Sequence, residues 1–322
     1  MLYLNTTDIK HLPPDWNEVV EYIGKAVQSL RSGDYAQPVK PYLRYKNLKN
    51  RIIAMPAYVG GDICFSGIKW IASFPDNIQE GVPRAHAVTV LNDADTGIPR
   101  CIINSAMTSG IRTAGVSAFV LTKYLDHKKH GNLKVGITGF GPIGQLHLQM
   151  LLALFGDRIT SVRIFDLKPI EPALLEGWTQ RNIQQVSSWE EAYTDADVFI
   201  TCTVSSHRYI NKPPKKGSLH LNVSLRDYEP DFLDHVDMMI VDDWEEICRE
   251  NTDVERMHIE KNLQEENTIS IADLLEGDVW QGLAENAVVM FNPMGMAVFD
   301  MAIAACYYHR SILENNGTSL TY

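Results

Sequence analysis

The stretch KVGITGFGPIGQLHLQMLLALFGDRITSVRIFD, from Lys134 to Asp166, decides the fold. It begins with a short apolar run that is long enough for a buried parallel strand, and the glycine-rich segment GFGPIG follows at once. Apolar residues then recur at helical spacing over 145–155, and a second apolar run over 162–165 ends on an acid. A strand, a glycine turn, a helix, a strand and an acid in this order predict a dinucleotide-binding unit.

Each glycine of the turn has a physical task. Gly139 permits the tight turn, Gly141 lets the backbone approach a pyrophosphate, and Gly144 allows helix and strand to pack closely. The N-terminus of the helix offers N–H groups and a positive dipole end to the phosphates. The residues expected to bind the cofactor here are Gly139, Gly141, Pro142, Ile143 and Gly144. The alternative interpretation is a glycine-rich turn in a flavodoxin-like sheet.

Asp166 stands 22 residues after Gly144, about where an acid accepts the ribose hydroxyls of a dinucleotide. A carboxylate at that place would repel a 2′-phosphate, which favours NAD over NADP. Lys168 lies two residues further on and weakens this preference, because it is basic. We expect NAD as the cofactor.

The composition excludes several classes of protein. The chain has 322 residues and is long enough for two domains, and its net charge of -11 argues against nucleic acid as a partner. Its five cysteines are scattered without a CxxC pair, so we expect neither disulfides nor a metal site. The longest apolar stretch, 287–308, is interrupted by Asn292, Pro293, Gly295 and Asp300, which is typical of a strand, turn and helix and not of a membrane span. The N-terminus has no signal-peptide pattern, so the expected location is cytoplasmic.

The first 110 residues predict an α+β unit with a mostly antiparallel sheet. An amphipathic helix is expected over 17–30, with its stop at Gly33, and a second helix over 109–124, beginning near Arg112. The expected strands cover 39–45, 51–58, 67–71, 87–91 and 100–104, with a hairpin loop over 92–97. In the first of these strands Lys40, Tyr42 and Arg44 share one face.

Strands and helices alternate after the glycine turn, which is the doubly wound pattern. The expected elements are a helix over 189–193, strands over 198–203, 218–223, 238–241 and 288–291, and a last helix over 297–308. The segment 242–285 is rich in Asp and Glu and is most simply a solvated face.

Several blocks of the chain resemble one family in both wording and order. MPAY (55–58), GIKW (67–70), SGIRTAGVSA (109–118), GFGPIG (139–144) and NPMGMAVFD (292–300) are similar to the ornithine cyclodeaminase/μ-crystallin family. Within it, QPVKPYLR, RIIAMPAYVGG, SGIKWI and NPMGMA resemble the dehydrogenases of 2,3-diaminopropionate biosynthesis, which accompany siderophore genes. The resemblance covers nearly the whole chain.

The fold that the resemblance implies is α/β: a Rossmann NAD-binding domain, plus an α+β substrate and dimerisation domain built from both chain ends. The expected boundaries are 1–113 with 301–322 for the substrate domain and 114–300 for the Rossmann domain. The implied partner is a second copy in a homodimer. The implied reaction is the NAD-dependent oxidation of N-(1-amino-1-carboxy-2-ethyl)-glutamate to 2,3-diaminopropionate and 2-oxoglutarate.

The resemblance also implies roles for individual residues. Lys69 in GIKW and Arg112 in SGIRTAG match the family's substrate-carboxylate residues, and Lys40 matches a basic position after QP. The family's catalytic aspartate follows an Asn by five positions, which places it at Asp227 after Asn222, although Ser224, Leu225 and Arg226 depart from the family's usual wording. The remaining residues expected along the cofactor are Thr203, Val204, Gly295 and Met296.

The residues themselves support an anionic substrate. Lys40, Arg44, Arg51, Lys69 and Arg112 lie on predicted strands or at a helix start, and such cations are rarely buried without an anionic partner. The alternative is that each pairs with one of the protein's own carboxylates or extends to the surface. A substrate with three carboxylates fits this set better than ornithine, whose side-chain ammonium it would repel. Lys69 either holds a carboxylate or shares in proton transfer with Asp227.

Other functions remain open at this stage. They are an ornithine cyclodeaminase, an alanine dehydrogenase or ketimine reductase, and a non-catalytic NAD(P) binder. Asp300 is expected to be a structural residue of the last helix, and His86 is a weaker candidate for the pocket. His127 and His130 are expected to face solvent.

Overall fold

The computed structural model describes residues 1–128, 131–175 and 182–321. His130 lies outside the described residues. The chain forms two compact units: residues 1–116 with 295–322, and residues 117–294. We expected residues 114–116 and 295–300 in the middle domain, but they belong to the first unit. The segment 295–300 contains the start of the last helix, which packs on the sheet of the first unit.

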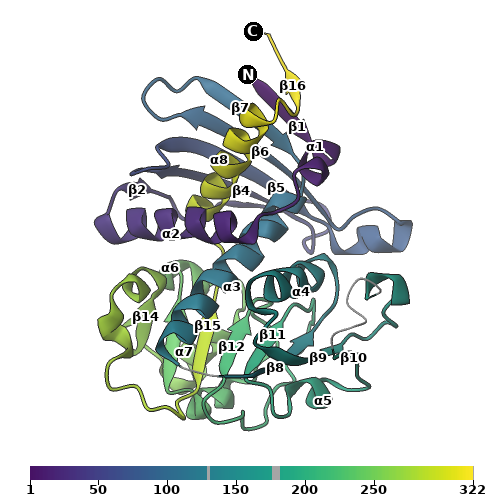
Figure 1. The fold of residues 1–322 in the computed structure, drawn as a ribbon, viewed down its shortest axis with the longest axis vertical. Helices are drawn as coiled ribbons and strands as arrows, with labels where there is room; N and C mark the ends of the chain where they lie inside the picture. The colour runs from purple at the N-terminus through teal and green to yellow at the C-terminus, as the bar shows by residue number, and fades with distance from the viewer. Residues whose placement is uncertain (129–130, 176–181, 322) are drawn as a thin grey trace. The chain divides into compact units, whose positions relative to one another are not determined.

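The first unit is built on one eight-stranded sheet (Figure 1). Its strand order is β16-β1-β7-β6-β5-β4-β2, with β3 also paired to β4. The β1–β7 pair is parallel and all others are antiparallel. The strands are β1 (Leu2–Asn5), β2 (Tyr35–Ala36), β3 (Tyr42–Leu43), β4 (Arg51–Val59), β5 (Phe65–Ser73), β6 (Ala85–Asp93), β7 (Pro99–Asn104) and β16 (Thr318–Ser319).

One face of this sheet is covered by helix α8 (Ala297–Leu313), which packs on β4, β5 and β6 and is the yellow helix of Figure 1. Helix α2 (Trp16–Ser32) packs on α8 through an apolar stripe that includes Val19, Ile23 and Val27. The helix ends at Gly33, whose φ of 73° is the left-handed cap that glycine adopts readily. The other helices that begin in this unit are α1 (Thr6–His11), η1 (Pro75–Glu80) and α3 (Met107–His127).

The second unit carries an eight-stranded sheet in which every pair is parallel. Its order is β10-β9-β8-β11-β12-β15-β13-β14, the doubly wound arrangement of a dinucleotide-binding fold. The strands are β8 (Leu133–Thr138), β9 (Ile159–Phe165), β10 (Ile183–Gln185), β11 (Val198–Thr201), β12 (Leu219–Asn222), β13 (Met238–Val241), β14 (Thr268–Ser270) and β15 (Val289–Asn292). Five of these strands are almost wholly buried, as expected for strands that are covered on both faces: β8, β11, β12, β13 and β15.

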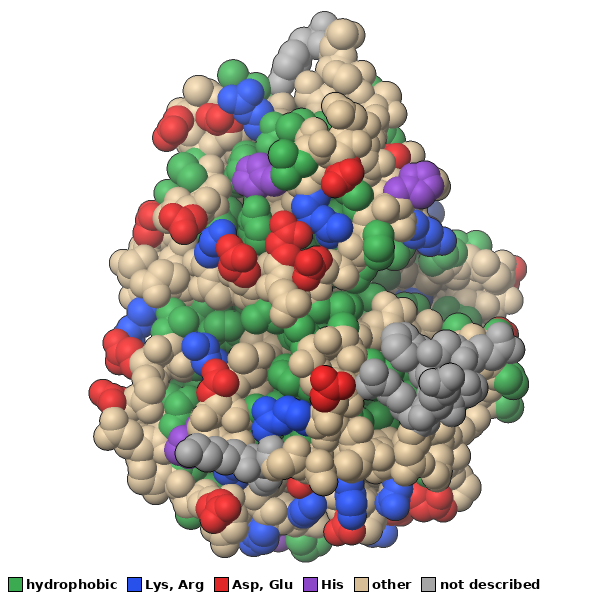
Figure 2. All heavy atoms as spheres, in the orientation of Figure 1, with side chains coloured by type: hydrophobic (Ala, Val, Ile, Leu, Met, Phe, Trp, Pro, Cys, Tyr) green, Lys and Arg blue, Asp and Glu red, His purple; other side chains and the backbone are tan. Residues whose placement is uncertain are grey.

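Short helices connect these strands. They are α4 (Pro142–Phe155), η2 (Pro172–Leu174), α5 (Trp189–Tyr193), η4 (Pro230–His235), α6 (Trp244–Ile247), α7 (Asp253–Lys261), η5 (Glu265–Asn267), η6 (Ile271–Leu275) and η7 (Gly277–Trp280). In the described ranges, every helix is too short or too polar to span a membrane. Figure 2 shows acidic and basic side chains interspersed over the visible face of each unit.

Three expectations from the sequence are wrong in detail. The strand over 39–45 shrinks to β3, so Lys40 and Arg44 lie outside it. Helix α3 begins at Met107, so Arg112 lies in its second turn and not at its positive end. The acidic segment 242–285 is only partly solvated, because Asp242, Glu246 and Asp253 are buried. Two of the buried acids have partners far away in the sequence, since Asp242 accepts the N–H of Met294 and Asp253 pairs with Arg208.

Candidate functional site

The glycine turn is fixed by close backbone contacts within the second unit. Gly139 has a φ of 86°, and its N–H donates to the carbonyl of Phe165 at 2.8 Å. A Cβ at Gly139 would lie 2.6 Å from the carbonyl carbon of Cys202, and one at Gly144 would lie 2.2 Å from the Gly139 oxygen. Both positions therefore require glycine, one for its φ and its contacts and the other for close packing.

Gly141 is different, because a Cβ there would meet no atom within 4 Å. It is the N-cap of α4, no side chain caps this helix end, and Pro142 follows at the first helical position. Gly141 and Pro142 are exposed, while Ile143 is half-buried. The first N–H groups of α4 thus lie at an open backbone surface, which fits the pyrophosphate of a dinucleotide.

Asp166 follows β9 directly and links the glycine turn to the loop after β9. Its Oδ2 accepts the N–H of Phe140 at 2.7 Å and its Oδ1 accepts that of Lys168 at 2.9 Å. An ionised carboxylate has about four lone-pair sites, so these two bonds leave acceptor capacity for ribose hydroxyls.

Two alanine substitutions should distinguish a glycine that the fold requires from one that cofactor binding requires. Gly141→Ala should leave the protein folded but weaken NAD binding about tenfold or more, since its methyl group would occupy the space of a phosphate. Gly139→Ala, the matched variant, should lower the free energy of unfolding by about 1–3 kcal/mol, because it strains the backbone. Fluorescence titration with NADH and chemical unfolding measure the two effects. Equal NAD affinity in Gly141→Ala and the unchanged protein would contradict this assignment.

Asp227 lies in the loop after β12, five residues beyond Asn222, and is fully buried. Its two carboxylate oxygens accept hydrogen bonds from the hydroxyls of Thr203 and Ser224. Thr203 follows β11, so the ends of neighbouring strands meet at this acid, as expected at the carboxyl edge of a parallel sheet. Val204, the residue after Thr203, is 69% exposed.

The environment of Asp227 makes it a proton acceptor near neutral pH. Burial raises the pKa of its carboxyl to about 6, the Thr203 and Tyr209 hydroxyls oppose this rise, and the nearby Asp253 carboxylate adds to it. General bases are most effective with a pKa near the working pH.

The first unit holds a buried group of three charges. Lys69 Nζ lies 2.7 Å from Asp300 Oδ2, and Arg112 Nε donates to Asp300 Oδ1 at 2.8 Å. All three side chains are at least nine-tenths buried. Asp300 lies in the first turn of α8, so the protein's own acid pairs with both cations. With Lys69 protonated, two cations share one carboxylate and the group keeps one net positive charge.

Opposing influences set the pKa of Lys69. Burial lowers the pKa of its ammonium to about 7, with Arg112 and Lys40 acting in the same direction and Asp300 opposing them. The Lys69 ammonium also donates to the Ser109 hydroxyl at 3.3 Å. A further carboxylate entering this group would restore the charged form of Lys69.

Lys40 joins the same group, although it lies outside a strand. It is buried, and its Nζ donates to the carbonyl of Gly295 at 3.1 Å. Gly295 has a φ of 90°, and a Cβ there would lie 2.7 Å from Nη1 of Arg112. The glycine thus admits the guanidinium, and the following Met296 is buried at the start of α8.

The other two expected cations lie together elsewhere. Arg44 and Arg51 each place their guanidinium 5.6 Å from the ring centre of Tyr42. Arg51 begins β4 and shares the α8-covered face of the sheet with Lys69, while Arg44 is exposed and donates to the Leu48 carbonyl. His86, the weaker candidate, is exposed on the opposite face, so it does not join Lys69.

The sequence analysis did not identify some of the residues around Asp227 and around Lys69 and Arg112. Asp300 lies in the first turn of the last helix, as expected, but the sequence did not show that it is the counter-charge of both Lys69 and Arg112. Ser224, Tyr209 and Asp253 around Asp227 carried no recognisable signal, since a serine, a tyrosine and an acid within polar segments are ordinary. His127 is exposed, as expected, and its ring stacks on Trp280. Across the described ranges, no group of three His, Cys, Asp or Glu side chains is arranged to hold a metal ion.

Comparisons with known proteins agree with this architecture. The model of the ornithine cyclodeaminase/mu-crystallin family matches residues 8–315. The N-((2S)-2-amino-2-carboxyethyl)-L-glutamate dehydrogenase of Staphylococcus aureus is 33% identical over 99% of this chain and 98% of its own.

Two solved structures share the fold over at least 99% of both chains. The Δ1-pyrroline-2-carboxylate reductase of Thermococcus litoralis, in complex with NADH and L-proline, has a TM-score of 0.88 and 23% identity. An archaeal alanine dehydrogenase dimer with bound NAD has a TM-score of 0.82 and 22% identity.

Proposed function

This chain belongs to the ornithine cyclodeaminase/mu-crystallin family, and we propose that it is an NAD-dependent dehydrogenase of N-(1-amino-1-carboxy-2-ethyl)-glutamate. The products are 2,3-diaminopropionate, 2-oxoglutarate and NADH. The similarity to the Staphylococcus aureus enzyme supports this substrate. A cytoplasmic location and a role in siderophore precursor synthesis belong to the same proposal.

The observation that carries the proposal is the excess of buried positive charge in the first unit. Lys69 and Arg112 share Asp300, and Lys40 is close enough to lower the pKa of Lys69. An anionic substrate would offset this excess, whereas the second ammonium of ornithine would add to it.

The reaction consists of an oxidation and a hydrolysis. Bound NAD would accept a hydride from the α-carbon of the glutamate half. The secondary amine loses its proton and a carbon–nitrogen double bond forms. Water then adds to that carbon, and the carbon–nitrogen bond breaks to release 2-oxoglutarate and the primary amine of 2,3-diaminopropionate. The proton of the water must move to the leaving amine, which requires a group that both accepts and returns it.

Asp227 is the residue proposed for this proton transfer. Its pKa of about 6 lets it accept a proton from the attacking water and then return it. Lys69 and Arg112 hold the α-carboxylate, and Lys69 can share in proton transfer because its own pKa is lowered to about 7. The glycine turn, Asp166, Thr203, Val204 and Met296 are proposed to hold the cofactor.

The test is to supply the purified protein with NAD and the candidate substrate and to follow NADH by absorbance. We expect NADH in equal amount to 2-oxoglutarate and 2,3-diaminopropionate. Ornithine should produce neither NADH nor proline. Proline must be measured as well as NADH, because a cyclodeaminase recycles its cofactor within one turnover. Release of proline and ammonia from ornithine would identify the cyclodeaminase instead. Oxidation of NADH with pyruvate and ammonia, or with a cyclic imine, would favour an alanine dehydrogenase or ketimine reductase.

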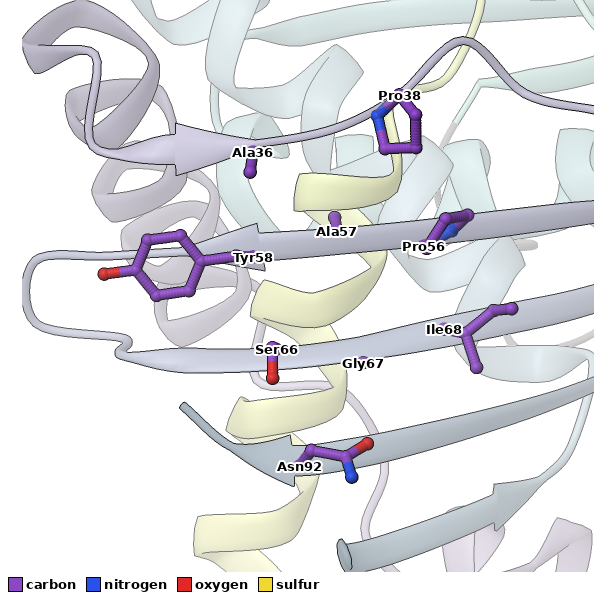
Figure 3. Close-up of a pocket in the computed structure, with 9 residues that line it drawn as sticks. All are labelled: Ala36, Pro38, Pro56, Ala57, Tyr58, Ser66, Gly67, Ile68 and Asn92. Carbon is purple, nitrogen blue, oxygen red and sulfur yellow. The ribbon is translucent and has the colours of Figure 1, made fainter. Parts of the chain in front are cut away.

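A homodimer is also part of the proposal. The sheet face of the first unit that α8 does not cover carries a row of partly exposed apolar side chains: Ile52, Ala54, Pro56, Ile68, Trp70, Val88, Val90 and Ile102. A shallow hollow of about 450 Å³ lies on this face, and its lining includes Pro56, Tyr58 and Ile68. Figure 3 shows these residues on their strands, with α8 behind. Such a continuous apolar face is typical of an interface between protein chains.

Replacement of Trp70, which is 44% exposed, should test the dimer. Trp70→Asp should shift the protein from dimer to monomer in analytical ultracentrifugation, because it would bury a charge at the interface. Leu167→Asp, a change at a 92% exposed residue of the second unit, is the matched control and should leave the mass unchanged. A dimer that persists in Trp70→Asp would exclude this face.

A further inference from the structure

The loop that carries Asp227 is held by a second buried acid, Asp253, at the start of α7. Asp253 Oδ2 accepts the N–H groups of Asp227 and Tyr228 at 3.1 and 3.2 Å. The same oxygen accepts from the Asn222 amide at 3.0 Å, and Oδ1 accepts from Arg208 Nε at 2.8 Å. All four partners are donors and favour the carboxylate form of Asp253, in opposition to burial, which raises the pKa of this group.

The contact between loop and acid is reciprocal. The backbone N–H of Asp253 donates to the carbonyl of Leu225 at 2.8 Å. Leu225 has a φ of 62°, a left-handed conformation that costs a leucine about 1–2 kcal/mol. Its side chain is buried in the apolar core of the second unit, and its N–H donates to Asn222 Oδ1 at 3.1 Å. Packing and Asp253 therefore maintain a strained turn two residues before Asp227.

We propose that Asp253 is a positioning residue for proton transfer, which fixes the Asp227 loop and opposes a second negative charge at Asp227. This inference rests on the proposed function, in which Asp227 moves the proton. Asp253 acts through Asp227 and does not contact the substrate. Asp253 forms an ion pair with Arg208. The negative charge of Asp253 raises the pKa of Asp227, and the positive charge of Arg208 acts in the opposite direction.

The phenol and thiol groups around Asp227 are neutral at the working pH. The Tyr209 and Tyr228 hydroxyls and the Cys202 thiol all have a pKa raised, first of all by burial. The Asp253 carboxylate raises the pKa of Asp227, and Arg208 is the cation paired with Asp253. Substitutions of Asp253 and Arg208 therefore test directly whether these charges control the pKa of Asp227.

The experiment compares Asp253→Asn, Arg208→Gln and the double variant in the pH dependence of kcat/KM. Asp253→Asn should move the acidic limb down by about one pH unit, because Asp227 loses a like charge and gains an unbalanced cation. Arg208→Gln should move the limb up, and the double variant should return it toward that of the unchanged protein. An unmoved limb in Asp253→Asn, or a shift of the same sign in both single variants, would overturn the proposal.

A second readout does not need turnover. The free energy of unfolding is measured against pH for each protein and for the same protein carrying Asp227→Asn. Because burial raises the pKa of Asp227 in the folded state, the stability that this acid contributes is present at low pH and is lost as pH rises through about 6. Asp253→Asn should move the centre of this loss to lower pH. If this shift occurs without any NADH formation, the coupling holds and the proposed substrate is wrong; if NADH forms without the shift, the coupling is wrong.

Discussion

Asp227→Asn should reduce kcat by about 10²–10⁴-fold, the range typical of losing a general acid–base residue. The amide keeps the shape of the side chain and one acceptor oxygen for the Thr203 or Ser224 hydroxyl, while its NH2 group can donate to the other, but it cannot take a proton from water. NADH binding should remain within about twofold, because the glycine turn is untouched. Steady-state kinetics and a fluorescence titration measure the two quantities.

The pH profile makes this prediction sharper. In the unchanged protein, kcat/KM should fall as pH drops through about 6, where Asp227 takes up a proton, and this limb should be absent from the residual activity of Asp227→Asn. Asp231→Asn, in the same segment but at an exposed acid paired with Lys261, is the matched control and should keep both rate and limb. Full activity in Asp227→Asn would leave NAD binding as the protein's remaining candidate function.

Asp300→Asn should lower the free energy of unfolding by about 3–5 kcal/mol, the cost of breaking a buried ion pair from one side. Lys69 and Arg112 would lose their shared carboxylate and remain buried. Burial alone would raise the pKa of Asp300, but Arg112 and Lys69 hold it below its usual value, so this stability is lost in acid as pH falls through the lowered pKa. Chemical unfolding at neutral and acidic pH measures the loss.

An added anion should identify the two cations as a carboxylate site. In Asp300→Asn, a dicarboxylate such as 2-oxoglutarate should raise the melting temperature more than it does in the unchanged protein, because it would replace the missing charge. Asp195→Asn, which breaks the exposed pair with Lys134, should cost about 1 kcal/mol or less and show no such rescue. Equal stabilisation in both variants would argue against a carboxylate site at this group.

The amino-acid sequence determined those features whose signals are local. The run from Lys134 to Asp166 specifies strand, turn, helix and strand within one stretch, and β8, α4 and β9 follow it. The apolar segments 51–58 and 67–71 likewise predicted the strands β4 and β5. The spacing from Asn222 to Asp227 placed the acid after a strand of the parallel sheet, where the structure has it.

Only the tertiary structure decided which charges meet. Asp300 is 188 residues from Arg112 in sequence, and its partnership with Arg112 and Lys69 depends on α8 packing against the sheet that carries Lys69. Asp253 is likewise far from Asp227, and its burial under the loop reversed the expectation of a solvated acidic face. A local pattern fixes backbone conformation because its interactions are between near neighbours; the partner of a buried charge is set by distant segments, and no local pattern encodes it.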